Sequence, residues 1–343
     1  MSKKIGILTG GGDCPGLNPA IRGCVYAAER MGYECVGFLE GWKGIVEGNT
    51  TPLDRAITKD IISVGGTMLG TSRTNPYKKE GGVDGVRRTF DKLGLHALVA
   101  MGGEDTLGVA NRLYNDFKFP VVGVPKTMDN DLSGTDYTFG FDSATSVAVD
   151  ALARLRDTAR SHRRVIVLEV MGRHAGWVSL FTAIAGNADY FCLPERRVDV
   201  DDMIKKIKAA HAANKYALVV ASEAIDLPST DSGEVQAKDD FGHVVLKGRG
   251  VGEKLSALIE EKTGIETRHA VIGHIQRGGS PTIYDRMLGT RVGVGAAKFV
   301  HAGQFGVMAA LAGDKVVPVP LSVAVGTLKT VSKEWLDFAD LMF

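Results

Sequence analysis

Four carboxylates and one lysine lie close together in the sequence, directly behind two apolar runs in the middle of the chain. They are Glu104, Asp105, Lys126, Asp129 and Asp131. Carboxylates grouped in this way can bind a divalent metal, accept a proton as a general base, or cap a turn. Capping is the usual role of a single aspartate, but four carboxylates together favour a site for a metal ion and phosphate groups.

A glycine-rich loop near the start of the chain offers a second contact for phosphate. Residues 5–8 are a short apolar run, residues 9–16 (TGGGDCPG) follow, and residues 18–31 have a helical pattern. A strand, a glycine loop and a helix in this order direct backbone N–H groups at a phosphate. The loop is neither G-x-G-x-x-G nor a Walker A motif, and a plain tight turn is the alternative. Three consecutive glycines favour phosphate contact.

Five arginines recur at the ends of predicted strands. They are Arg73, Arg164, Arg173, Arg268 and Arg277. Guanidinium groups in this number suit a substrate that carries more than one phosphate. No Ser, Cys or His nucleophile triad accompanies them. Arginines, carboxylates and a glycine loop together favour direct, magnesium-assisted phosphoryl transfer.

The elements that position these residues alternate between strands and helices. Residues 96–101 and 120–124 are predicted strands, and residues 107–117 between them are a predicted helix. The strands of such a unit run parallel and lie near each other, and the loops that follow them open at the carboxyl edge of the sheet. The charged residues are therefore expected at that edge.

The same alternation continues to the C-terminus and predicts an α/β fold. A long helix is predicted over residues 142–161, with Asp142 or Ser143 as its N-cap. Residues 305–319 are predicted to form a terminal hairpin. Residues 225–250 are rich in turn-forming residues, which predicts a surface excursion.

Composition indicates a globular, cytoplasmic protein. Its 343 residues include 41 Lys and Arg against 40 Asp and Glu, and 44% are hydrophobic. This balance gives no support for binding to nucleic acid or a membrane surface. The four cysteines have no partners at metal-ligand spacing, which disfavours zinc and suits a reducing cytoplasm. Neither a signal peptide nor a membrane span is expected.

Six stretches, taken together, resemble the phosphofructokinase family over essentially the whole chain. They are residues 8–16 (LTGGGDCPG), 65–73 (GGTMLGTSR), 102–106 (GGEDT), 125–131 (PKTMDND), 169–173 (EVMGR) and 273–281 (GHIQRGGSP). The resemblance implies two Rossmann-like three-layer αβα domains with mainly parallel sheets and the active site in the cleft between them. A phosphoryl-donor domain would comprise residues 1–140 with about 276–324, and a sugar-phosphate domain residues 141–275 with about 325–343.

The resemblance also implies roles in phosphoryl transfer to the 1-hydroxyl of fructose 6-phosphate. Asp129 matches the general base, and Thr127 and Asp131 support the transferred group. Arg173 matches the arginine that stabilises charge in the transition state, and Lys126 acts beside it. The residues matched to the phosphoryl donor are Gly12, Arg73, Gly103, Asp105 and Lys126.

The same resemblance implies how the sugar, the metal and a neighbouring subunit take part. The residues matched to fructose 6-phosphate are Thr127, Met171, Gly172, Arg173, Glu223, His274 and Arg277. Glu104, where an aspartate is usual, and Asp131 are matched to Mg²⁺. Arg164 and Arg268 match arginines that complete a neighbour's 6-phosphate site, which implies a homodimer or homotetramer.

Two positions indicate the donor. Asp105 stands where ATP-using relatives typically have glycine, because the backbone there passes close to the α-phosphate. Two like charges about 4 Å apart repel by ~4 kcal/mol at an effective dielectric near 20, on the order of a thousandfold in binding. Lys126 replaces a glycine of many ATP users and can neutralise pyrophosphate. The pair resembles the pyrophosphate-dependent branch of the family, and an ATP-dependent enzyme is the alternative.

Two readings from other functional classes are weaker. A nucleotide-binding regulatory protein that has lost its chemistry would not need the intact set of Asp129, Asp131 and Arg173. A dinucleotide oxidoreductase would be expected to carry G-x-G-x-x-G and a ribose-binding acid at the right distance. Any turnover with pyrophosphate or ATP would exclude the first of these.

Overall fold

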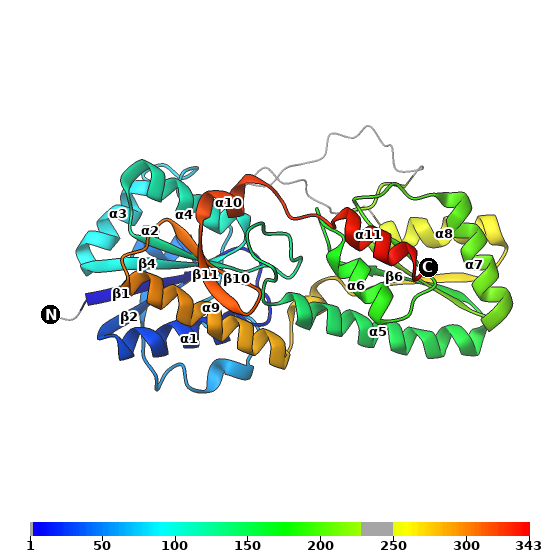
Figure 1. Ribbon diagram of the computed structural model, residues 1–343, viewed down its shortest axis with the longest axis horizontal. Helices are drawn as coiled ribbons and strands as arrows, with labels where there is room; N and C mark the ends of the chain where they lie inside the picture. Colours follow the sequence, from blue (N-terminus) through cyan, green and yellow to red (C-terminus); the bar gives the residue numbers. More distant parts are fainter. Residues whose placement is uncertain (1–2, 228–249) are drawn as a thin grey trace.

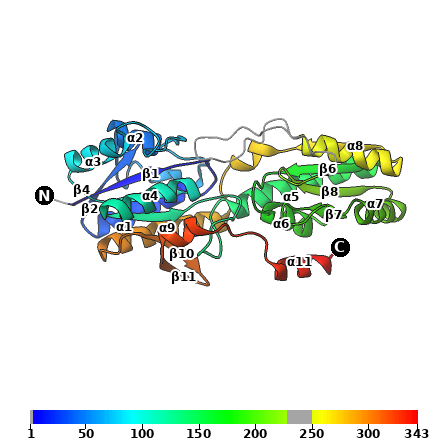
Figure 2. The same cartoon turned by 90° about the horizontal axis from the view of Figure 1, so that it is seen from above.

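Two β-sheets organise the chain, one in each half of an elongated molecule (Figures 1 and 2). The computed structural model describes residues 3–227 and 250–343. Within these residues the larger sheet has the strand order β11-β10-β5-β4-β1-β2-β3, and the smaller has the order β7-β8-β6-β9. Paired strands are parallel except β2 with β3 and β10 with β11, both at edges of the larger sheet. The predicted α/β fold with mainly parallel sheets is confirmed.

Alternating burial places the larger sheet between two layers of helices. Ile5 and Ile7 pack into one hydrophobic cluster and Leu8 into another, because successive side chains point to opposite faces. The strands are β1 (Lys3–Thr9), β2 (Tyr33–Phe38), β3 (Thr50–Leu53), β4 (Leu95–Gly102), β5 (Val121–Pro125), β10 (Val307–Ala312) and β11 (Lys315–Pro320). One layer holds α1 (Leu17–Arg30) and α9 (Ile283–His301); the other holds α2 (Trp42–Glu47), α3 (Gly82–Leu93), α4 (Glu104–Phe117) and α10 (Leu321–Gly326).

The smaller sheet is built in the same way. Ile166 and Leu168 face one helix layer, while Val165 and Val167 face the other. The strands are β6 (Val165–Val170), β7 (Tyr190–Cys192), β8 (Ala217–Ser222) and β9 (Thr267–Val271). The helices are α5 (Phe141–His162) and α6 (Trp177–Ala185) on one face and α7 (Val200–Asn214) and α8 (Val251–Thr263) on the other. Two short 3₁₀ helices, η1 (Asp60–Ser63) and η2 (Gly273–Arg277), and the closing helix α11 (Lys333–Asp340) complete the described elements.

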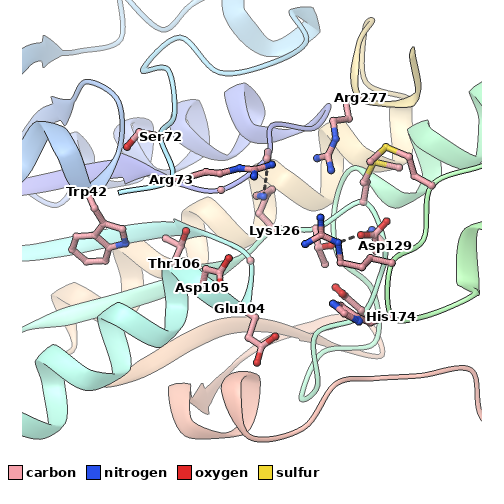
Figure 3. Close-up of a pocket in the computed structure, with 18 of the residues that line it drawn as sticks. Trp42, Ser72, Arg73, Glu104, Asp105, Thr106, Lys126, Asp129, His174 and Arg277 are labelled. Carbon is pink, nitrogen blue, oxygen red and sulfur yellow. Dashed lines mark hydrogen bonds between the residues drawn. The ribbon is translucent and has the colours of Figure 1, made fainter. Parts of the chain in front are cut away.

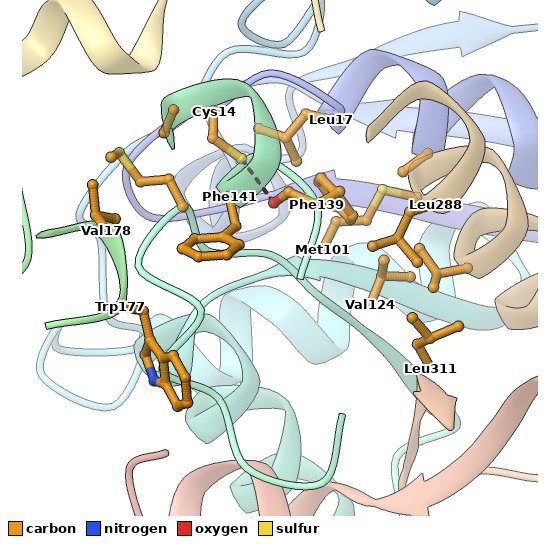
Figure 4. Packing of buried hydrophobic residues seen from close by; sticks show 14 of the residues in the cluster. Cys14, Leu17, Met101, Val124, Phe139, Phe141, Trp177, Val178, Leu288 and Leu311 are labelled. Carbon is orange, nitrogen blue, oxygen red and sulfur yellow. Dashed lines mark hydrogen bonds between the residues drawn. The ribbon is translucent and has the colours of Figure 1, made fainter. Parts of the chain in front are cut away.

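One hydrophobic cluster continues from the larger unit into the smaller. Phe139 and Phe141 lie at the start of α5, and Phe141 packs edge-on against Phe181 of α6 with ring centroids 4.9 Å apart. Figure 4 shows these side chains between Trp177 and the core of the larger sheet. The chain also returns through α9 and crosses again between α10 and α11 (Figure 1). The cleft between the units is therefore framed by a shared core rather than by one flexible linker.

Three details of the predicted elements need correction. Helix α4 begins at Glu104, three residues before its predicted start, so the two carboxylates behind β4 belong to its first turn. Neither Asp142 nor Ser143 caps α5, because the helix begins at Phe141 and both residues lie inside its first turn. The residue before the helix is Gly140, in a left-handed conformation, and the Ser143 hydroxyl donates to Asp285 Oδ2 (2.6 Å). Helices α2, α3 and α10 and strand β3 were missed.

Two further predicted elements agree with the structure, and one lies mostly outside the described residues. The strand–helix–strand unit of β4, α4 and β5 is confirmed, with β4 and β5 parallel and adjacent. The terminal hairpin of β10 and β11 is also confirmed. Most of the predicted excursion at residues 225–250 lies outside the described residues. Across residues 3–227 and 250–343, no helix combines the length and hydropathy needed to span a bilayer.

Candidate active site

The carboxyl ends of strands from both sheets meet at one cleft of about 180 Å³. One wall comes from the loops after β1 and β5, the first turn of α4 and the segment at residues 72–74. The other wall comes from the turns after β6 and β8 and from η2. Drug-sized ligands occupy roughly 300–1,000 Å³. A cleft of this size, lined mainly by charged and polar groups, suits small anions.

Most of the predicted site residues line this cleft. They are Gly12, Arg73, Gly103, Glu104, Asp105, Lys126, Thr127, Asp129, Asp131, Met171, Arg173, Glu223 and Arg277. Figure 3 shows Arg73 and Lys126 on one side and Arg277 and Asp129 on the other. These residues come from segments more than 200 positions apart, and the fold brings them together at the sheet edges.

Close contacts explain why the first loop is made of glycines. A Cβ at Gly10 would lie 2.5 Å from Oγ1 of the buried Thr106, at the start of α4. A Cβ at Gly12 would collide with the guanidinium of Arg277. Arg277 also donates from Nη1 to the carbonyl oxygen of Asp13 (3.0 Å). The loop therefore holds an arginine from the distant η2 over its backbone, and a side chain at position 12 would displace that guanidinium.

Lys126 is a buried cation at the base of the cleft. Its side chain is 4% exposed, and its Nζ donates to the carbonyl oxygen of Gly12 (2.5 Å). Burial lowers the pKa of Lys126, while Asp129 and Asp131 oppose that shift. The lysine thus links the loop after β5 to the glycine loop and places positive charge where a compact anion can bind.

Asp129 has the environment of a general base. Its backbone N–H donates to Thr127 Oγ1 (3.1 Å). Its Oδ1 is inaccessible to solvent and has no hydrogen-bond partner among the described residues. Burial, and then the negative charge of Asp131, raise the pKa of Asp129 to about 7, against the attraction of Arg277. A carboxylate with this pKa can exchange a proton with a hydroxyl near neutral pH.

The carboxylates that line the cleft include Glu104 and Asp131, the two residues matched to Mg²⁺. Within the described residues no three His, Cys, Asp or Glu side chains converge as an all-protein metal cage would require. Mg²⁺ usually keeps several waters and binds through one or two carboxylates plus substrate phosphates. The chemistry of these side chains therefore suits an ion that phosphate groups help to hold.

The opposite wall is fixed by hydrogen bonds to its backbone. The N–H of Met171 donates to Oε1 of the fully buried Gln276 (2.8 Å), and the Ser222 hydroxyl donates to the carbonyl oxygen of Gly172 (2.5 Å). Gly172 has φ 143°, a conformation that favours glycine. This turn positions Arg173 at the cleft. Burial raises the pKa of the nearby Glu223, and the charge of Arg173 opposes that shift.

Four predicted sugar contacts are not among the residues that line the cleft: Gly172, Arg164, Arg268 and His274. Arg164 precedes β6 and Arg268 lies near the start of β9, at the amino ends of their strands and away from the cleft. Arg164 Nε lies 2.7 Å from Glu266 Oε2, and Arg268 also pairs with that glutamate. His274 is exposed on η2. The structure thus leaves Arg164 and Arg268 on the outer surface of a single chain.

Comparison with known proteins agrees with this geometry. A sequence profile described as phosphofructokinase matches residues 4–300. A pyrophosphate–fructose 6-phosphate 1-phosphotransferase of Streptomyces coelicolor is 49% identical, with 99% of each chain covered. The chain belongs to the phosphofructokinase family. "ATP-dependent 6-phosphofructokinase 3" of the same organism is 46% identical over 96% of each chain.

A solved structure extends the agreement to the fold of the phosphofructokinases. Pichia pastoris phosphofructokinase in the T-state superposes with a TM-score of 0.82 at 28% sequence identity. The match covers 100% of this chain and 36% of the yeast chain. Overall identity separates the two S. coelicolor relatives by only a few per cent, so the choice of donor has to be read from individual residues.

Asp105 lies at the boundary between two spaces. Together with Glu104, it lines both the cleft and a neighbouring groove of about 280 Å³ that runs along α4. The groove is walled by Tyr77 and Arg112, whose guanidinium lies 3.8 Å from the centre of the tyrosine ring. A ligand that extended from the cleft into the groove would lie near the carboxylates of Glu104 and Asp105.

The structure adds cleft residues that sequence reasoning missed. They are Gly11, Trp42, Ser72, Thr74, Thr106, Met128 and His174. Trp42 is 1% exposed, and its indole Nε1 has no hydrogen-bond partner in the described part of the chain. Trp42 packs in the hydrophobic core between the larger sheet and α2, and it also borders the cleft. Ser72 and Thr74 flank the predicted Arg73, and this adjacency is the feature of the sequence that could have identified them as cleft residues.

Proposed function

We propose that this protein is a pyrophosphate-dependent 6-phosphofructokinase. It transfers a phosphoryl group from diphosphate to the 1-hydroxyl of fructose 6-phosphate, giving fructose 1,6-bisphosphate and phosphate, and the reaction is reversible. The observation that carries the choice of donor is the position of Asp105 between the phosphate cleft and the adjoining groove.

Pyrophosphate fits the cleft better than ATP for two reasons. The Asp105 carboxylate repels the α-phosphate of a nucleotide that extends toward the groove, by an order of ~4 kcal/mol for charges about 4 Å apart. Pyrophosphate ends before that point and meets the buried ammonium of Lys126, which is fixed on Gly12. Repulsion of the wrong donor and attraction of the right one both contribute to specificity.

Catalysis consists mainly of positioning and charge stabilisation. Asp129 removes the proton from the 1-hydroxyl, whose oxygen then attacks the terminal phosphorus of pyrophosphate. The bond between that phosphorus and the bridging oxygen breaks, and inorganic phosphate leaves. Arg173 and Lys126 stabilise the negative charge that spreads over the transferred group, and Thr127 orients it. These groups are preset by the folded chain, so little reorganisation accompanies the reaction.

Magnesium is the cofactor that the donor set supports. Glu104 and Asp131 would hold the ion together with oxygens of pyrophosphate and water. When bound, Mg²⁺ neutralises phosphate charge during transfer. The phosphates themselves would contact Gly12, Gly103 and Arg73, and Asp105 would lie beyond them, toward the groove.

The sugar side is proposed to be completed by a second copy of the chain. Met171, Gly172, Arg173, Glu223 and Arg277 would bind fructose 6-phosphate within one chain, and His274 would reach it from η2. Arg164 and Arg268, at the outer ends of β6 and β9, would reach the 6-phosphate of a neighbouring subunit. In this arrangement residues 1–140 with about 276–324 bind the donor, and residues 141–275 with about 325–343 bind the sugar.

A donor assay tests the proposal directly. Purified protein is supplied with fructose 6-phosphate and Mg²⁺, and with either nucleotide-free pyrophosphate or ATP. We expect kcat/KM for pyrophosphate to exceed that for ATP by about a hundredfold or more, part of the repulsion estimated above. A preference for ATP would support the alternative, ATP-dependent enzyme, whose relatives are nearly as similar in sequence.

A further inference from the structure

A segment between α10 and α11 crosses behind the candidate active site. Residues 327–332 connect the larger unit to the smaller one (Figure 1). Leu328 forms an isolated antiparallel bridge with Leu132, and the N–H of Lys329 donates to the carbonyl oxygen of Asp131 (2.8 Å). The segment therefore contacts the loop that carries Asp129 and Asp131, and Lys329 lines a separate hollow beside Asn130 rather than the cleft.

The ammonium group of Lys329 is fixed by three acceptors of the catalytic loop and its continuation. Nζ donates to Asn130 Oδ1 (3.2 Å) and to the carbonyl oxygens of Thr135 (3.2 Å) and Asp136 (2.5 Å). It also lies 5.6 Å from the centre of the Tyr137 ring. A lysine with all three donors engaged holds one conformation, so these contacts fix the loop as well as the lysine.

Asn130 connects the hydrogen bonds of Lys329 to the turn that carries the two catalytic carboxylates. It stands between Asp129 and Asp131, is 2% exposed and has φ 52°, which is uncommon for a residue with a side chain. Its Oδ1 also accepts from the backbone N–H of Thr138 (3.2 Å), and the Thr138 hydroxyl donates to the carbonyl oxygen of Thr127 (2.7 Å). Lys329 is therefore one end of a network that sets the turn carrying the proposed base.

The backbone of the same residue reaches the opposite wall of the cleft. The carbonyl oxygen of Lys329 accepts from Nε1 of Trp177 (2.8 Å), the first residue of α6. Two residues on, the N–H of Val331 donates to Glu195 Oε1 (2.9 Å), which also accepts from the N–H of Gly176. Gly176 and Trp177 directly follow the turn that carries Arg173.

We infer that Lys329 is a positioning residue that sets the distance between Asp129 and Arg173 across the cleft. This inference rests on the proposed function. The side chain of Lys329 fixes the turn of the base, and its carbonyl oxygen fixes the helix that follows the arginine. It touches neither substrate, so its loss should misplace catalytic groups while binding groups such as Lys126 and Arg73 remain.

The test is the kinetics of Lys329→Met, which keeps the length of the side chain but removes its donors. We expect kcat to fall about tenfold or more, because small misplacements of catalytic groups are costly, while the two substrate KM values stay within about threefold. Lys329→Arg should recover part of kcat. The matched control is Lys333→Met, which removes an exposed lysine paired only with Asp337 on α11 and should leave kcat unchanged.

A second variant keeps the test decisive if Lys329→Met folds poorly. Trp177→Phe removes the hydrogen bond at the other end of the connection and should also lower kcat rather than raise KM. The double variant should lose less than the product of the two single effects, because both act through one connection. Two results would overturn the inference: a kcat for folded Lys329→Met within about twofold of wild type, or a loss of kcat in the double variant equal to the product of the two single losses.

The test of Lys329 can succeed or fail independently of the test of the phosphoryl donor. Each variant is compared with wild type using whichever donor the wild type prefers. A wild type that prefers ATP would contradict the choice of donor but would still allow the kcat comparison to support or overturn the role of Lys329.

Discussion

The two walls of the cleft differ in how complete they are within one chain. The donor wall is closed: Lys126 is 4% exposed and bonded to Gly12, and Arg277 is held over the glycine loop. The proposed sugar wall is incomplete in one chain, because Arg164 and Arg268, which we propose serve a neighbour's site, lie at the far ends of their strands. Donor choice should therefore depend on individual side chains near α4, whereas sugar binding should depend on assembly.

The walls also differ in how burial affects their charges. On the donor side, burial lowers the pKa of Lys126; on the sugar side, burial raises the pKa of Glu223. Asp129 lies between them and has its pKa raised to about 7. Variants that alter one wall at a time separate the contributions of the two walls.

The largest expected effect is that of Asp129→Asn. The amide keeps the shape of the side chain but cannot accept the proton, so kcat should fall by ~10²–10⁴ while the KM for pyrophosphate changes little. Steady-state kinetics with both substrates measures this. The control is Asp150→Asn, an exposed aspartate of α5 that pairs with Arg154. Near-normal kcat in Asp129→Asn would show that another group takes the proton.

The pH dependence should follow the raised pKa of Asp129. Below about pH 7 the protonated form dominates, so kcat/KM for fructose 6-phosphate should rise up to about tenfold per pH unit and level off above the inflection. The reverse reaction needs the protonated acid and should decline as pH rises through the same inflection. Bound Mg²⁺ would offset the charge of Asp131 and move the inflection lower, but burial remains the larger cause. A flat profile around neutral pH in both directions would speak against this base.

Mixing inactive subunits tests the open sugar wall. Arg164→Ala and Asp129→Asn should each be inactive alone, yet a mixed dimer has one site with Asp129 from one chain and Arg164 from the other. Random mixing should restore roughly a quarter of wild-type activity if the oligomer is a dimer with shared sites. Arg154→Ala, an exposed arginine of α5 paired with Asp150, should stay active as the control. No recovery in oligomers shown to be mixed would mean that each site is complete in one chain.

Sequence periodicity predicted the parts of the fold that depend on local pattern. The apolar runs of β4 and β5 and the helix between them follow from hydrophobic spacing, and their adjacency follows from the tendency of consecutive strands to be neighbours in a sheet. The start of α4 was predicted too late, because Glu104 and Asp105 read as a loop although acidic residues suit the first turn of a helix.

Contacts between distant segments could not be predicted from local pattern. The cap of α5 depends on Asp285, which engages Ser143 from the other end of the chain. The packing of Arg277 over Gly12 and the bonds of Lys329 to the catalytic loop join residues far apart in sequence.

The most direct test of the account compares donors in wild type and three variants: Asp105→Gly, Lys126→Gly, and the two changes together. kcat/KM for pyrophosphate and for ATP is measured at saturating fructose 6-phosphate and fixed free Mg²⁺. Asp105→Gly should raise kcat/KM for ATP roughly tenfold or more, because it opens the cleft to the groove beside Tyr77 and removes a repulsive charge.

The two changes together should gain further ATP use and lose pyrophosphate activity, while Lys126→Gly alone should mainly weaken pyrophosphate use. We expect the wild type to have the higher kcat/KM with pyrophosphate, and the Asp105→Gly variant to have a higher kcat/KM with ATP than the wild type. A wild type that prefers ATP would contradict the assignment of the donor. A pyrophosphate-preferring wild type whose Asp105→Gly variant gains no ATP activity would contradict the role given to Asp105.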